Sequence, residues 1–213
     1  MVLPMWYRGD CLDEIMEDLK RFPVIPAIRD VSRIDAAVSK KSRCIFLLTG
    51  NILNIKNIVR RVKSANRRIF LHLDLLEGIS KNSMGIKYIA QEIKPDGVIT
   101  TRANLINCAK TEGLFTIQRI FVLDSLAIDT AVKSIKNVNP DAIEILPAVI
   151  PKIIRRICQR TRHPIIAGGL IEDIQEVREA LKEGAWAISV TKEDIWNIPF
   201  EDLEIRRKSF LGE

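Results

Sequence analysis

Residues suited to holding a phosphate group gather in the last quarter of the chain. Gly168 and Gly169 follow an apolar run, and Ser189, Val190 and Thr191 end the next one. Adjacent glycines lack side chains, so backbone N–H groups can approach an oxyanion, and nearby hydroxyls add donors. We therefore predict a phosphate site at these five residues. The glycines alone would fit a tight turn between a strand and a helix equally well.

The segment after the two glycines supports the phosphate interpretation. Its apolar spacing predicts a helix over residues 172–183. The start of a helix carries partial positive charge, so its N–H groups would point at the same anion. Lys192, just past the second apolar run, would add a cation.

A second set of polar residues lies near the ends of other apolar runs. It comprises Thr49, His72, Asp74, Arg119 and Glu144. His72 and Asp74 are two residues apart, which predicts that they share one face of a strand. Arg119 is the expected counter-charge of Glu144, because an isolated buried carboxylate is costly. We interpret the set as contacts for a polyol, with an internal structural salt bridge as the alternative for the Arg119–Glu144 pair.

The same residues give little support to catalysis. A Schiff-base aldolase needs a lysine on a barrel strand, and none of the apolar runs contains one. His72, Asp74 and Glu144 could bind a divalent metal, but their spacing is not diagnostic. Asp74 with His72 could act as an acid–base pair. The set is better suited to binding a small polyol phosphate, so we predict no catalytic residue, no metal and no cofactor.

Eight short apolar runs, each followed by a helical pattern, would position these residues. The runs lie at 24–28, 44–48, 69–73, 97–99, 116–122, 142–146, within 163–170, and at 185–190. A helix over 11–21 precedes the first, and the helices between them are expected at 32–40, with Ser32 as N-cap, 54–65, 84–93, 104–112, 126–136 and 149–160. Strict alternation predicts a parallel sheet, and eight units predict one small TIM (β/α)8 barrel domain over residues 1–213. An open doubly wound sheet is the alternative.

Composition sets broad limits on the class of protein. The chain has 213 residues, is 47% hydrophobic but only 6% aromatic, and carries a net charge of +6. Aliphatic residues suit parallel sheets, and the mild basic excess permits an acidic partner. Cys11, Cys44, Cys108 and Cys158 are far apart, which predicts free thiols in a reducing compartment. With no signal-peptide core and no run long enough to span a bilayer, we expect a cytoplasmic protein.

Two predicted helices carry basic residues along one face. Lys152, Arg155, Arg156 and Arg160 form one stripe, Lys56, Arg60 and Lys63 form the other, and residues 206–208 add charge near the C-terminus. No acidic residue interrupts 152–162, whereas a helix that only needs to be soluble usually mixes signs. We interpret both stripes as candidate RNA-binding surfaces that contact the phosphate backbone. An ordinary solvated outer face is the alternative.

Six stretches of the chain together carry a family resemblance. They lie at 45–50, 69–80, 96–101, 116–125, 144–147 and 164–171, and the most specific are His-Leu-Asp-Leu-Leu-Glu-Gly at 72–78 and Gln-Arg-Ile-Phe-Val-Leu-Asp-Ser at 118–125. With them the sequence resembles the glycerol-uptake operon antiterminator regulatory proteins. The chain departs from the family pattern at Ala148, where glycine is usual, and at Val190 and Thr191, where Ser-Thr-Ser is usual from Ser189.

The resemblance implies a TIM barrel that binds glycerol 3-phosphate and the leader of a messenger RNA, so that transcription passes a terminator. It implies no catalysis. From the residues alone, two other functions stay open. One is a sugar-phosphate-metabolising enzyme of isomerase or lyase type with Asp74 or Glu144 as base, and the other is a phosphate-binding barrel that acts through a protein partner.

Overall fold

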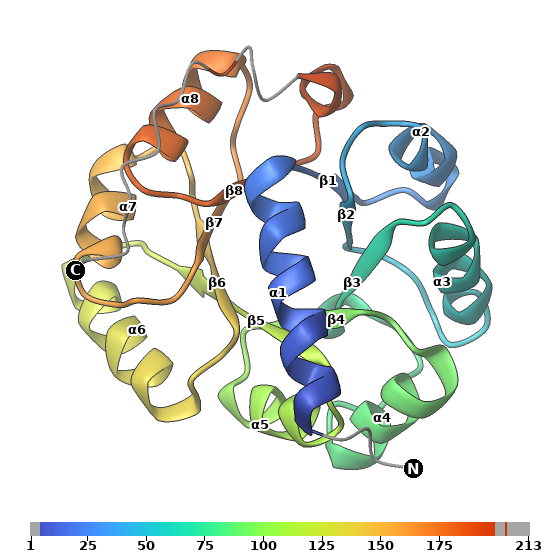
Figure 1. The fold of residues 1–213 in the computed structure, drawn as a ribbon. Coiled ribbons are helices and arrows are strands. Elements are labelled where there is room, and N and C mark those ends of the chain that lie inside the picture. The colour runs from blue at the N-terminus through green and yellow to red at the C-terminus, as the bar shows by residue number, and fades with distance from the viewer. Residues whose placement is uncertain (1–4, 199–202, 204–213) are drawn as a thin grey trace.

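The computed structural model describes residues 5–198 and residue 203, and within them eight parallel strands close into a barrel (Figure 1). Each strand pairs with the next in sequence, and β8 pairs with β1. The strands are β1 (Val24–Ile28), β2 (Cys44–Leu47), β3 (Arg68–His72), β4 (Gly97–Thr100), β5 (Phe115–Phe121), β6 (Ala142–Leu146), β7 (Ile165–Gly168) and β8 (Ala187–Val190). The predicted TIM barrel is confirmed, and the open sheet is wrong.

Helices surround the ring of strands (Figure 1). They are α1 (Met5–Arg21), α2 (Ile34–Val38), α3 (Ile55–Ser64), α4 (Ser83–Tyr88), α5 (Ala103–Thr111), α6 (Ser125–Val138), α7 (Pro151–Cys158) and α8 (Ile174–Lys182). Shorter 3-10 turns are η1 (Val31–Arg33), η2 (Leu73–Leu75) and η4 (Glu193–Asn197), and α4 continues into the π-helix η3 (Ile89–Ile93). Of the eight α-helices within the described residues, seven follow a strand, as the alternating pattern predicts.

Side chains along each strand alternate between the barrel interior and the helical layer. The interior cluster includes Phe46, Phe70 and Phe115, whose rings meet edge to face at centroid distances of 5.5 and 5.6 Å. A larger apolar cluster fills the space between strands and helices. Because side chains alternate along a strand, every second residue after Phe70 and Phe115 also faces the interior. Nearer the C-terminal ends of the strands these inward-facing residues become polar, and they include His72 and Arg119.

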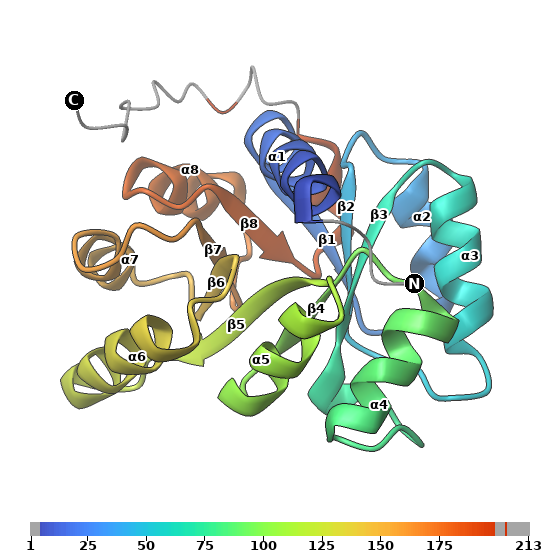
Figure 2. The same ribbon diagram turned by 60° about the horizontal axis from the view of Figure 1, so that its bottom comes forward.

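Helix α1 lies across the N-terminal end of the barrel (Figures 1 and 2). Its residues Ile15 and Leu19 are fully buried and join the interior cluster. The helix begins at Met5, six residues before the start expected from the apolar spacing. With α1 closing this end, the polar interior residues lie toward the opposite, C-terminal end.

The segment after β1 differs from the sequence prediction. A 3-10 turn and the short helix α2 replace one continuous helix over 32–40. Ser32 was the expected N-cap, but the side chain of Asp30 caps the turn by accepting the N–H of Ser32 at 3.0 Å. Asp30 can cap the turn because an aspartate side chain readily accepts the backbone N–H of the residue two positions later in the chain.

The cysteines described are free thiols, with Cys44 buried and Cys108 and Cys158 partly buried. Burial raises the pKa of Cys158 to about 11. The side chain of Cys11 and the basic residues 206–208 lie outside the described set. Within that set, no helix is long and apolar enough to cross a membrane.

Candidate functional site

Glu144 is the centre of a buried polar cluster near the C-terminal ends of the strands. One carboxylate oxygen, Oε2, lies 2.6 Å from Nε of Arg119, its register partner on β5. The other, Oε1, accepts the hydroxyl of Ser189 on β8 at 2.6 Å. Glu144 is 0% exposed, so these contacts offset the cost of burying its charge. The predicted pairing of Arg119 with Glu144 is therefore confirmed.

The hydroxyl of Ser189 has a consequence for the predicted phosphate site. A serine has one O–H to donate, and here Glu144 accepts it. Toward a ligand, Ser189 can then only accept, which suits a ligand hydroxyl and not a phosphate oxygen. Ser189 therefore fits the polyol side of the predicted site.

Position 168, beside this cluster, requires a glycine because a side chain would not fit there. A Cβ atom there would lie 2.2 Å from Oγ of Ser189 and 3.0 Å from Oε1 of Glu144. The next residue, Gly169, has a positive φ of 81°, and Leu170 follows at 64°. The two glycines thus serve different purposes, one for close approach and one for the left-handed turn that glycine favours.

His72 points from β3 into the same interior and lacks hydrogen bonds. It is 3% exposed, and neither ring nitrogen has a partner among the described residues. Burial and, to a smaller extent, the charge of Arg119 lower the pKa of His72 to about 4, although the charge of Asp74 opposes both. The ring is therefore neutral near pH 7 and offers one donor and one acceptor. Nearly all buried polar groups are paired in native proteins, so the two nitrogens mark a place for a ligand or water.

Asp74 lies in the turn η2 and not on the strand. β3 ends one residue earlier than predicted, so the alternation does not reach Asp74, and the expectation that it shares a strand face with the histidine is wrong. Its Oδ2 accepts the hydroxyl of Thr100 at 3.0 Å and the N–H of Thr101 at 2.9 Å. Nε of Arg102 lies 3.1 Å from Oδ1.

This second cluster contains residues that sequence reasoning did not assign to the site. Thr100, Thr101 and Arg102 meet Asp74 at the end of β4, and the polar triplet after an apolar run was their signal. Lys81 lies near enough for the charges of Asp74 and Arg102 to act on it, although burial is the main influence and lowers its pKa. Nothing in the local sequence distinguishes Lys81 from other loop lysines.

The start of α8 does not present free N–H groups to an anion. The helix begins at Ile174, and Oδ1 of Asp173 accepts the N–H groups of Gln175 and Glu176 at 2.8 and 3.0 Å. Glu176 in turn accepts the N–H of Glu172 at 2.6 Å. Two carboxylates thus accept N–H groups that were expected to point at the ligand anion, so the predicted contribution of this helix start to the phosphate site is wrong.

Lys192 also differs from expectation. Its Nζ donates to the carbonyl oxygen of Glu172 at 2.7 Å and lies 3.4 Å from the carboxylate of the same residue. The cation that was expected to face the anion is therefore engaged with an acidic residue of the β7–α8 loop.

The remaining predicted contacts lie around the cluster in different environments. The side chain of Val190 packs in the outer apolar cluster, so only its backbone can face a ligand. Thr191 is exposed and Thr49 partly exposed. Ala148 is buried, and its N–H donates to the carbonyl oxygens of Gly168 and Gly169 at 2.8 and 3.2 Å, which fixes the turn.

The two basic stripes have acidic partners on neighbouring elements. Arg155 pairs with Glu183, Arg160 with Asp129 at 2.6 Å, Lys56 with Glu92 at 3.0 Å and Lys63 with Asp96 at 3.3 Å. The inference that α7 lacks acidic partners is therefore wrong, because helix packing supplies them from distant sequence. Arg60, Lys152 and Arg156 are exposed and form no ion pair with any described residue. Those three are the stripe residues whose charge is left for a partner.

Comparison with known proteins identifies the family. A family model described as glycerol-3-phosphate responsive antiterminator matches residues 24–196, which include all eight strands and the buried cluster. The chain belongs to this family. The Escherichia coli (strain K12) protein YgcP, described as an uncharacterized protein, is 37% identical over 180 residues, covering 84% of this chain and 94% of that protein.

Solved structures agree with the antiterminator family assignment. The glycerol uptake operon antiterminator regulatory protein from Listeria monocytogenes is 32% identical, with a TM-score of 0.79 over 81% of this chain and 94% of that one. A glycerol uptake operon antiterminator-related protein from Thermotoga maritima is 30% identical, with a TM-score of 0.73 over 81% and 96%. Deoxyribose phosphate aldolase from Aeropyrum pernix, 12% identical over 88% of this chain and 95% of that one with a TM-score of 0.63, shares the fold alone.

Proposed function

We propose that this member of the antiterminator family is a regulator that binds glycerol 3-phosphate, or a similar small polyol phosphate, inside the C-terminal end of the barrel. Bound ligand would change how the protein binds the leader of a messenger RNA and so control genes of glycerol uptake. The observation that carries the proposal is His72, a buried ring without hydrogen bonds beside the Arg119–Glu144–Ser189 cluster.

The polar groups divide into two halves that suit the two ends of such a ligand. A ligand hydroxyl can donate to Ser189 or to the acceptor nitrogen of His72, and accept from its donor nitrogen. The phosphate then lies toward the turn at Gly169 and the hydroxyl of Thr191, where backbone N–H groups are accessible without side chains in the way. In this arrangement the protein contacts both the hydroxyl end and the phosphate end of the ligand, so the site should prefer the phosphate ester to free glycerol.

Binding without catalysis is the function that these contacts support. Both oxygens of Glu144 are held by Arg119 and Ser189, and Oδ2 of Asp74 accepts from Thr100 and Thr101, so neither carboxylate is placed as a general base. No strand among the described residues carries a lysine for a Schiff base. The described residues also contain no group of three His, Cys, Asp or Glu side chains that could hold a metal ion.

Thermal unfolding with added ligand tests the small-molecule part. Glycerol 3-phosphate at millimolar concentration should raise the melting temperature, and glycerol should not, because a ligand that binds the native state stabilises it. His72→Ala should abolish most of the shift. Arg155→Ala, which removes an ion pair between α7 and Glu183 outside the cluster, should leave it unchanged. An absent shift in the unmodified protein contradicts the proposed ligand.

The regulatory part requires coupling between ligand and RNA. Affinity for RNA should differ between protein alone and protein saturated with glycerol 3-phosphate, since a regulatory ligand must bind one conformation better than another. Equal affinities would contradict regulation even where both partners bind. Turnover of a triose phosphate by the purified protein would favour an enzyme instead.

A further inference from the structure

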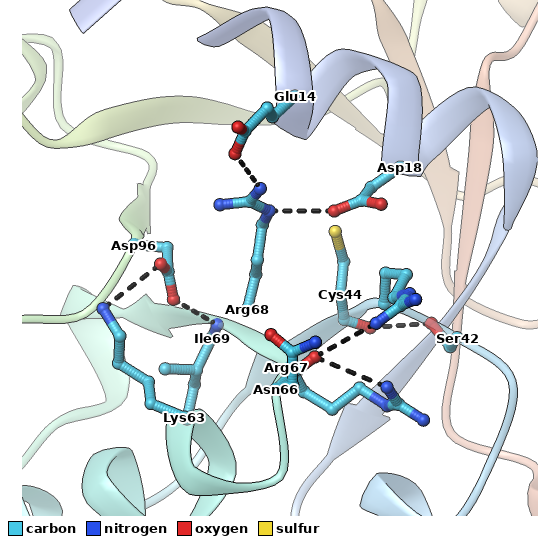
Figure 3. Close-up of polar contacts among 11 residues, drawn as sticks. Glu14, Asp18, Ser42, Cys44, Lys63, Asn66, Arg67, Arg68, Ile69 and Asp96 are labelled. Atoms are coloured by element: carbon cyan, nitrogen blue, oxygen red, sulfur yellow. Dashed lines mark hydrogen bonds and ion pairs between the residues drawn. The ribbon is translucent and has the colours of Figure 1, made fainter. Parts of the chain in front are cut away.

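The N-terminal face of the barrel holds a charged pocket that the ligand site does not use. Its volume is about 520 Å³, and it lies beside α1 over the starts of β2, β3 and β4. The lining residues are Glu14, Glu17, Asp18, Arg43, Lys63, Asn66, Arg67, Arg68 and Asp96, most of which Figure 3 shows. Some of these charged residues form ion pairs with one another and others do not, and the unpaired ones indicate what the pocket binds.

Two of the four cations in the pocket are neutralised by carboxylates. Arg68 lies 2.7 Å from Glu14 and 2.9 Å from Asp18, both on α1 (Figure 3). Lys63 lies 3.3 Å from Asp96. Three of the four lining carboxylates are therefore occupied. The fourth, Glu17, is exposed and forms no ion pair among the described residues.

The other two cations, Arg43 and Arg67, share a carbonyl and lack a carboxylate partner in the described part of the chain. Nη1 of Arg43 lies 3.5 Å, and Nη1 of Arg67 3.4 Å, from the carbonyl oxygen of Asn66. Arg67 also donates to the carbonyl oxygen of Lys40 at 3.0 Å, but its Nε is buried without a hydrogen bond. Burial lowers the pKa of Arg67 and the charge of Arg43 lowers it further, while Asp18 opposes both. The two guanidinium groups thus repel each other across a space where an anion would offset the repulsion.

An aromatic ring adjoins Arg43. Phe22, at the end of α1, is partly exposed, with the guanidinium carbon of Arg21 5.5 Å and that of Arg43 5.9 Å from its ring centroid. Flat guanidinium and aromatic groups next to two arginines without a carboxylate partner suit single-stranded RNA, whose phosphates bind arginine and whose bases stack on such planes. An acidic peptide would use the arginines but would leave the ring without a partner.

We propose that a backbone phosphate of RNA binds between Arg43 and Arg67, with a neighbouring base stacked at Phe22 and Arg21. This inference rests on the proposed RNA-binding function and assigns the RNA-binding site to the N-terminal face of the barrel. The small-molecule site and the RNA site then lie at opposite ends of β3, with Arg67 and Arg68 at one end of the strand and His72 at the other. The stripe on α7 is not the principal RNA contact.

The test measures binding of the full chain to a fluorescent oligouridylate of about 20 nucleotides, by anisotropy at several salt concentrations. Arg43→Gln/Arg67→Gln should lower affinity about tenfold or more at low salt and reduce the slope of log affinity against log salt by about 0.7, the value for the one phosphate contact that is lost. Glu17→Gln should act in the opposite direction and raise affinity, because it removes a negative charge from the pocket. Phe22→Leu should lower affinity without changing the salt slope.

The matched control is Lys152→Gln/Arg156→Gln, which removes the same charge from exposed positions on α7. A loss equal to or larger than that of the Arg43 and Arg67 variant would overturn the proposal. So would an unchanged salt slope in the Arg43→Gln/Arg67→Gln protein, which would mean that the two arginines only bind the carbonyl oxygens of Asn66 and Lys40. Arg43→Lys/Arg67→Lys keeps the charge and should retain most of the salt slope.

Two readouts separate this proposal from the proposed function. The melting-temperature shift with glycerol 3-phosphate should be the same in the Arg43→Gln/Arg67→Gln variant as in the unmodified chain, which also shows that the variant is folded. If the unmodified chain does not bind the oligouridylate, the RNA-binding function and this site both fail. If it binds and only the α7 variant loses affinity, the function stands and this site is wrong.

Discussion

At the C-terminal end of the barrel, the side chains of Arg119 and Glu144 are 8% and 0% exposed and meet at 2.6 Å. At the N-terminal end, Arg68 is 21% exposed and forms ion pairs with two carboxylates, those of Glu14 and Asp18, of which Glu14 is 68% exposed. Both ends place an arginine against acidic residues near the barrel axis. They differ in how much water reaches the charges.

That difference separates what each end can do. In the interior, a charge that loses its partner stays desolvated, so the cluster must be complete in every folded molecule. At the N-terminal end, water screens the pairs, so individual contacts can open and exchange for those of a ligand at small cost. The first arrangement suits a fixed pocket for a small molecule, and the second suits a surface that binds and releases a polyanion.

The largest expected effect is at the buried pair. Arg119→Met should lower the free energy of unfolding by about 3 to 5 kcal/mol, because it leaves the Glu144 carboxylate buried without its counter-charge. Arg68→Met should cost only about 1 kcal/mol, since Asp18 and Glu14 can be solvated. Urea denaturation of both variants gives the comparison directly.

A double variant checks the cause. Arg119→Met/Glu144→Leu should recover most of the loss, because apolar residues often replace a buried ion pair with little change in stability. Equal losses from Arg119→Met and Arg68→Met would show that the two ends do not differ in the way described.

An intermediate effect is expected from the protonation of His72. Its pKa is about 4 when folded, against an ordinary value of 6.5, so the unfolded chain binds more protons between these values. The free energy of unfolding should therefore be unaffected by this group above about pH 6.5 and fall as the pH drops toward 4, by about 3 kcal/mol in total.

His72→Gln provides the difference curve for this prediction. Burial also lowers the pKa of His163, so both proteins lose some stability in acid, but only the unmodified chain should show the additional loss. Identical curves for the two proteins from pH 7 to pH 4 would mean that water reaches the ring and that the histidine is not desolvated.

The fold could be predicted because its signals are local and repeated. β1 and β6 have the bounds that the apolar runs gave, Val24–Ile28 and Ala142–Leu146. The Arg119–Glu144 pair could be predicted as well, because a carboxylate between two isoleucines must find a cation inside the protein. Both inferences follow from rules that hold wherever the chain is buried.

The parts that failed depend on single-residue geometry or on long-range contacts. Asp74 does not lie on the strand face because β3 ends one residue earlier than predicted. At the start of α8, backbone N–H groups that were expected to face a ligand donate to Asp173 instead. Arg43 and Arg67 are brought to the same carbonyl only by the pairing of β2 with β3. No periodicity in the sequence predicts that these two side chains meet.

The smallest expected effect concerns the outer helix α7 and tests the limit of the comparison. Arg155 forms an ion pair with Glu183, and the two side chains are 63% and 13% exposed. Arg155→Gln should change the free energy of unfolding by less than about 1 kcal/mol, and Arg156→Gln, which breaks no ion pair, by less than about 0.5 kcal/mol. Urea denaturation at low and high salt measures both. A cost for Arg155→Gln that approached that of Arg119→Met would mean that an ion pair with an exposed arginine stabilises the barrel as much as the buried pair does, and water access would then not be what distinguishes its two ends.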